Sequence, residues 1–150
     1  MEKDPSELSN LLGYKFIKPE YFRLALSHSS LSVRESNERY EFLGDRILSL
    51  VIAEMLLVKF PDEKEGDIAK RHTALVRQEA IIKVAEALEL GNFIKMDRGT
   101  EAKGGRANPS ILADCCEAVI AALYIDGGLG VAKKFILTHW MLQLDDTAKP

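Results

Sequence analysis

Residues 38–60 read ERYEFLGDRILSLVIAEMLLVKF, and this stretch decides the fold. It contains no proline until Pro61 follows it, and it predicts one long helix. The first third is amphipathic, whereas from Ile47 to Val58 the stretch is apolar almost all round, apart from Ser49 and Glu54. A helix of this kind is typical of the middle of a helical bundle, so we expect the rest of the chain to pack around it.

Proline, glycine and asparagine mark the starts and ends of further predicted helices. These helices cover about 5–12, 19–26, 67–89 (one long helix or two short ones), 109–125 and 130–144. Residues 100–107, TEAKGGRA, predict a loop. The two-residue alternation of strands is found nowhere. The sequence therefore predicts an all-α domain over residues 1–145, with 146–150 as the start of a linker.

The composition is that of a globular protein, with 47% hydrophobic and 29% charged residues. The first ten residues lack the apolar core of a secretory signal. The longest apolar stretch, 47–58, is too short for a bilayer span and contains Glu54. The adjacent Cys115 and Cys116 predict buried, reduced thiols. We therefore expect a cytoplasmic protein with no membrane contact. The net charge of −3 counts against nucleic-acid binding.

Carboxylates stand where buried helices should have none. At about 100° per residue, Glu38, Glu41 and Asp45 fall within an arc of about 60°. Asp114 and Glu117 share a face of the helix that continues as the apolar run CCEAVIAALYI. A buried carboxylate must be paired, protonated or bound to metal, because an unpaired charge there costs several kcal/mol. Oxygen-only ligands favour Mg²⁺ or Mn²⁺, so the pattern predicts a metal site of that kind.

Other interpretations remain open at this point. The acids could be ordinary exposed side chains, or they could pair with Arg39, Arg46 or Arg71. The three histidines lie in no Glu-x-x-His pair and precede no aspartate, so the ferritin-like and histidine-aspartate metal sites are not indicated. Residues 27–30, SHSS, place no base and orienting acid around a serine, and they predict a turn held by side-chain hydrogen bonds.

Residues 37–48, NERYEFLGDRIL, closely resemble the signature of the ribonuclease III family, usually written NERLEFLGDSVL. The match continues with the Gly-Gly loop at 104–105 and with PSILADCCEAVIAALYIDGG at 109–128, in family order and spacing. It covers roughly residues 6–145. Two departures are Tyr40 in place of leucine and Arg46 in place of a small residue.

The resemblance implies a set of site residues. The four metal-binding acids of the family match Glu41, Asp45, Asp114 and Glu117, of which Asp45 and Glu117 would be tied most directly to the chemistry. Two further acids with a role in the family's catalytic valley match Glu38 and Glu65. The signature phenylalanine, here Phe42, packs into the partner subunit in the family, which implies a homodimer.

The resemblance also implies an activity. Bacterial members hydrolyse double-stranded RNA with Mg²⁺, which Mn²⁺ can replace, and they leave 5′-phosphate and 3′-hydroxyl ends; ribosomal RNA precursors are the expected substrates. These members usually continue into a basic double-stranded-RNA-binding domain, which we expect to be absent from this chain and which would explain its acidic charge. Lys70, Arg71, Lys103 and Arg106 are candidates for phosphate contacts.

Two other functions fit parts of the pattern. A ribonuclease III-like module without activity would normally have lost some metal-binding acids, and here all are present. An all-α nucleotide pyrophosphohydrolase also uses paired acids on helices, as in Glu38-x-x-Glu41, but its second acid pair would lie closer along the chain than 114–117.

Overall fold

A computed structural model describes residues 2–32 and 36–145 of the chain, and the regular structure in these residues is helical, which confirms the all-α prediction. The helices are α1 (Pro5–Leu12), α2 (Pro19–Ala25), α3 (Glu38–Lys59), α4 (Glu65–Val76), α5 (Gln78–Ala87), α6 (Arg98–Ala102), α7 (Pro109–Gly127) and α8 (Leu129–Asp145), with 3₁₀ turns η1 (Leu90–Phe93) and η2 (Gly105–Ala107). The predicted linker at 146–150 lies outside the described residues. Among those described, no helix combines the length and hydropathy that a bilayer span requires.

Two of the helix starts that the sequence predicts, those of α1 and α7, are made by side-chain caps. The Asp4 carboxylate accepts a hydrogen bond from the Ser6 N–H at 3.0 Å, and the Asn108 side chain accepts one from the Ile111 N–H at 3.1 Å. Each satisfies a backbone donor that the first helical turn leaves unpaired. Gly13 ends α1 with a φ of 70°, in the left-handed region that glycine adopts without strain.

The structure decides one helix prediction that was left open and corrects one loop prediction. Residues 67–89 form two helices, because Arg77 takes an extended conformation between α4 and α5. Residues 100–107 are not the loop that their glycines predicted, because α6 and η2 cover most of them. Asp97 starts α6 by accepting a hydrogen bond from the Thr100 N–H at 2.8 Å. Arg106 holds the segment down, and its Nη1 donates to the carbonyl oxygens of Gly91 and Ile94 at 2.9 and 2.8 Å.

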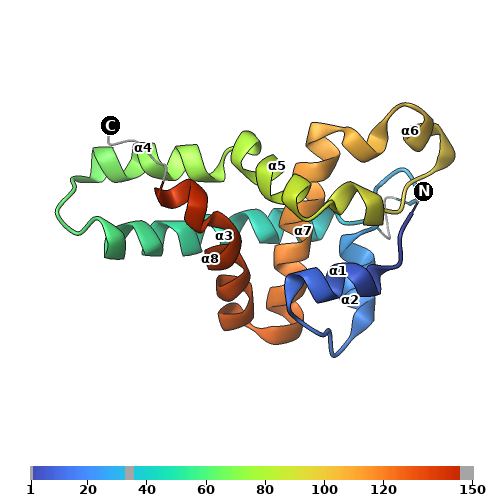
Figure 1. Cartoon of the computed structure of the whole chain (residues 1–150), viewed down its shortest axis with the longest axis horizontal. Helices are drawn as coiled ribbons and strands as arrows, with labels where there is room; N and C mark the ends of the chain where they lie inside the picture. Colours follow the sequence, from blue (N-terminus) through green and yellow to red (C-terminus); the bar gives the residue numbers. More distant parts are fainter. Residues whose placement is uncertain (1, 33–35, 146–150) are drawn as a thin grey trace.

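Helix α7 forms the centre of the core. It is buried from Cys115 to Leu123, and it packs against α2, α3, α5 and α8. In Figure 1 it crosses α3, which runs beside α4 as an antiparallel pair. The indole of Trp140 on α8 is fully buried and donates to the Leu75 carbonyl of α4 at 3.0 Å. The acids on α7 therefore stand on the most firmly packed element of the described chain.

The prediction that α3 lies in the middle of the bundle is only half right. One face of its apolar half, including Leu48, Ile52 and Leu56, is buried. The opposite face is open, with Leu50 and Leu57 exposed by 57% and 64%. Sequence periodicity reports how apolar a helix is all round, but it cannot say whether the same chain or another one covers each side.

Candidate metal centre

The site begins where α3 and α7 cross. A Cβ atom added to Gly44 would overlap the backbone carbonyl of Glu117, so only glycine lets the two helices approach this closely. The crossing brings the acid-bearing start of α3 against the first half of α7 (Figure 1). Carboxylates some seventy residues apart in the sequence therefore face one another.

Three of the predicted acids meet at this crossing. One carboxylate oxygen each from Glu41, Asp114 and Glu117 lies within 4.8 Å of the other two. Glu117 is only 5% exposed, and its Oε2 atom is buried without a hydrogen-bond partner. A buried carboxylate oxygen left unpaired is costly unless it is protonated or meets a cation. The oxygen-only ligand set and this orphaned atom fit a hard divalent cation.

The pKa values of Glu41, Asp114 and Glu117 are all raised, as expected for carboxylates that are buried close together. Burial raises the pKa of Glu117 to about 9, aided by hydrogen bonding to Asp45 and by the charges of Asp45, Glu41 and Asp114. Burial, followed by the charge of Asp114, raises the pKa of Glu41. Burial also raises the pKa of Asp114, and the nearby His28 opposes that rise. Burial and mutual repulsion thus favour the protonated forms of these three acids, and a bound divalent ion would favour the charged forms.

Asp45 lies beside this group but outside its closest set. It lies one helical turn after Glu41 on α3, near enough to Glu117 to raise the pKa of that group. Its Oδ2 atom accepts a hydrogen bond from Arg46 Nη1 at 2.5 Å. Of the arginine pairings that the sequence left open for the acids of the site, Arg46–Asp45 is one that forms.

The two remaining acids are placed differently. Glu38 opens α3 close to the group, and its charge raises the pKa values of Glu41 and Asp114. Glu65 opens α4, beyond the far end of α3, and it does not join the other acids within one chain (Figure 1). The catalytic roles of both remain predictions.

Two of the four candidate phosphate-binding residues are engaged elsewhere. Arg71 is buried, its guanidinium donates to both Glu63 oxygens at 2.7 and 2.8 Å, and it stacks over the Phe60 ring at 3.8 Å. Arg106 is held by the carbonyls of Gly91 and Ile94 and by Glu101, whose carboxylate lies 3.0 Å from Nη2. Both arginines tie turns to helices, so the phosphate role is wrong for them. Lys70 and Lys103 are exposed.

A junction beside the site escaped the sequence reasoning. The Ala25 carbonyl at the end of α2 accepts hydrogen bonds from Asn37 Nδ2 at 3.0 Å and from Cys115 Sγ at 3.6 Å. Asn37 and Cys115 each precede or follow a site acid, so this one carbonyl ties the acid-bearing parts of α3 and α7 together. The signal was present in Asn37, the first residue of the signature at 37–48. The turn predicted at 27–30 is confirmed, since the Ser30 N–H donates to His28 Nδ1 at 3.0 Å.

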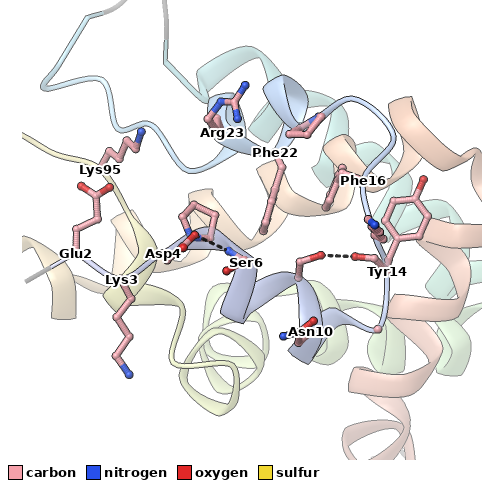
Figure 2. Close-up of a pocket in the computed structure, with 15 residues that line it drawn as sticks. Glu2, Lys3, Asp4, Ser6, Asn10, Tyr14, Phe16, Phe22, Arg23 and Lys95 are labelled. Atoms are coloured by element: carbon pink, nitrogen blue, oxygen red, sulfur yellow. Dashed lines mark hydrogen bonds between the residues drawn. The ribbon is translucent and has the colours of Figure 1, made fainter.

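A separate cavity of about 980 Å³ lies on the α1–α2 side of the molecule. Figure 2 shows Phe16 and Phe22 at its wall, with ring centroids 4.4 Å apart, and Lys95 and Arg23 at its edge. None of the six predicted site acids lines it. It is therefore distinct from the acid group at the α3–α7 crossing.

The fold and the site together define an all-helical protein with carboxylates from two crossing helices around a place suited to a divalent cation. Comparison with known proteins gives the family. A family model described as ribonuclease-III-like matches residues 18–144. The chain belongs to this family, as the signature at 37–48 predicted.

Two individual relatives and one solved structure support the family assignment. Ribonuclease 3 of Wolbachia pipientis (from Culex pipiens) is 43% identical over 149 residues, covering 95% of this chain and 65% of that protein. Ribonuclease 3 of a Jannaschia species is 47% identical, over 86% of this chain and 58% of that protein. The chain thus spans less than two thirds of the length of these relatives. A solved nuclease domain of ribonuclease III from Campylobacter jejuni, described for flexibility in a region involved in dimer formation, matches with a TM-score of 0.87. It is 38% identical over 92% of this chain and 99% of that one.

Proposed function

We propose that this chain is the nuclease domain of a divalent-metal-dependent endoribonuclease that cuts double-stranded RNA. The observation that carries the proposal is Glu117, whose buried, unpartnered oxygen meets Glu41 and Asp114 at a helix crossing. Family membership and the similarity to ribonucleases named Ribonuclease 3 support the same activity. Mg²⁺ is the cation we expect, with Mn²⁺ able to replace it.

The chain's own residues would share the work as follows. Glu41, Asp114 and Glu117 would hold the cation, and Asp45 would join them by leaving Arg46. The bound ion would supply charge neutralisation at the phosphodiester and an activated water for in-line attack. Glu117 is buried on the well-packed α7, so its carboxylate would need little rearrangement during the reaction. Glu38, at the rim, would face the substrate side of the group. The products would carry 5′-phosphate and 3′-hydroxyl ends.

We also propose a homodimer formed through α3. Phe42, Leu50 and Leu57 are spaced by eight and seven residues, so they form one stripe on this helix. They are exposed by 58%, 57% and 64%. An apolar stripe with more than half of each side chain exposed is typical of an interface. Because Glu41 and Asp45 lie on the same helix, two copies would place two acid groups along one surface and could cut both strands of a duplex.

Three finer points complete the proposal. A-form shape and 2′-hydroxyl contacts would select duplex RNA, rather than the reading of bases. Ribosomal RNA precursors are the substrates we expect. The free buried thiols of Cys115 and Cys116 agree with a cytoplasmic location.

The test uses Glu117→Gln, which keeps the size of the side chain and removes its charge. The variant should lose cleavage of duplex RNA in Mg²⁺ by about a hundredfold or more, while the control variant Glu86→Gln, an exposed acid on α5, should cut normally. Single-stranded RNA and nucleoside triphosphates are assayed alongside. Full activity of Glu117→Gln would remove the assignment, and triphosphate hydrolysis alone would favour a pyrophosphohydrolase.

A further inference from the structure

Arg46 occupies an unusual place at the edge of the acid group. Neighbouring residues on a helix lie about 100° apart and do not normally face each other. Yet Arg46 Nη1 reaches back to the Asp45 carboxylate at 2.5 Å. One turn earlier, the Phe42 ring lies under the Arg46 guanidinium, with 4.2 Å between its Cζ and the ring centroid. The guanidinium is therefore held between an aromatic face and a carboxylate.

Its positive charge acts on more than its immediate partner. The charge of Arg46 opposes the rise in the pKa of Glu41, which places it within electrostatic reach of the acid group. Arg39 and Arg71, the other arginines considered as partners for the acids, show no such pairing with Asp45, and Arg71 is committed to Glu63. Arg46 is also one of the two positions at which this chain departs from the usual form of the family signature, which has a small residue there.

We propose that Arg46 is a tethered counter-cation of the site, which holds Asp45 when the metal is absent and competes with a divalent cation for that carboxylate. The inference rests on the proposed function, because it requires the acids to bind a metal ion. Metal binding would then have to displace the guanidinium from Asp45 or accept its repulsion at short range. Arg46 would lower the metal affinity of the site while keeping its carboxylates partly neutralised.

The test compares wild type with Arg46→Gln, Arg46→Lys and the matched control Arg77→Gln. Arg77 is as exposed as Arg46 and pairs with a near neighbour in sequence, Glu79, at 2.8 Å, but it stands at the α4–α5 junction rather than on α3 or α7. Mn²⁺ is the probe. Its free concentration is followed by electron paramagnetic resonance at low salt, and thermal unfolding is recorded in EDTA and in saturating Mn²⁺.

We expect Arg46→Gln to bind Mn²⁺ about two- to fivefold more tightly, a span set by the strength of exposed ion pairs. Its melting temperature should rise more on adding Mn²⁺ than that of wild type, whereas a merely structural role would shift both conditions equally. Arg46→Lys and Arg77→Gln should match wild type, because both keep a positive charge at position 46.

Two results would overturn the inference alone. One is wild-type or weaker Mn²⁺ affinity in Arg46→Gln, and the other is Arg46→Lys binding as tightly as Arg46→Gln, which would remove charge as the cause. Failure of all four proteins, wild type included, to bind Mn²⁺ would overturn the proposed function together with this inference, so the two failures are distinguishable.

Discussion

Gly44 and Glu117 depend on each other at the helix crossing. The glycine lets the α3 backbone touch the α7 backbone at the residue whose side chain completes the acid group. Sequence reasoning placed Glu117 correctly among buried apolar residues, because a single charge in an apolar helix is a visible anomaly. It assigned no role to Gly44, since a glycine within a helix shows nothing of what lies opposite it.

Gly44→Ala should therefore damage both stability and the site. The added methyl group meets a backbone carbonyl that cannot rotate away, so we expect a loss of about 3 kcal/mol or more in the free energy of unfolding. Gly66→Ala is the matched control, because a Cβ there meets nothing within 4 Å. It should be neutral or stabilising by up to about 1 kcal/mol. Urea denaturation measures both, and equal stability of the two variants would contradict the crossing described here.

The raised pKa of Glu117 predicts how stability depends on pH without metal. The fold favours the protonated form of the Glu117 carboxyl. The contribution of Glu117 to the free energy of unfolding is therefore complete below the unfolded pKa of 4.5 and is lost as the pH rises toward about 9. In EDTA, the free energy of unfolding should fall across this range. Glu117→Gln should make the slope shallower by up to about 1.4 kcal/mol per pH unit. Parallel pH profiles for wild type and the variant would show that the shift is absent.

At the scale of elements, some features of α3 could be predicted from the sequence and others could not. Its length, its start at Glu38 and its acid-bearing face followed from periodicity and from Pro61. The exposure of one face of α3 could not be predicted in this way, because local sequence patterning does not say which chain would cover the stripe at 42, 50 and 57. The α6–η2 segment was missed for another reason. Its glycines predicted a loop, whereas the Asp97 cap and the contacts of Arg106 hold it in short helical turns.

The exposed stripe of α3 leads to a prediction about assembly. Leu50→Lys places a charge in the middle of the stripe and should shift a dimer toward monomer, because an unpaired charge in an apolar interface is costly. Ile17→Lys changes an even more exposed apolar side chain on the α1–α2 connection, away from α3, and should leave assembly unchanged. Analytical ultracentrifugation distinguishes the two. A Leu50→Lys protein with the wild-type sedimentation profile would place the interface elsewhere.

At the scale of the whole molecule, two sequence motifs about seventy residues apart become one site only through the packing of α7 against α3. The sequence could predict which acids were anomalous, and the resemblance supplied their roles. Neither could show that Glu41, Asp114 and Glu117 form the tight group while Asp45 is drawn toward Arg46. That arrangement depends on rotamers and on the depth of burial, which residue spacing does not specify.

The most direct measurement is a crystal structure of the protein grown with Mn²⁺, with anomalous scattering used to locate the ion. We predict a strong peak bounded by the carboxylates of Glu41, Asp114 and Glu117, with Asp45 turned away from Arg46 toward it. A well-ordered acid group with no anomalous density at saturating Mn²⁺, and with Glu117 still enclosed and unliganded, would contradict a metal-dependent nuclease site.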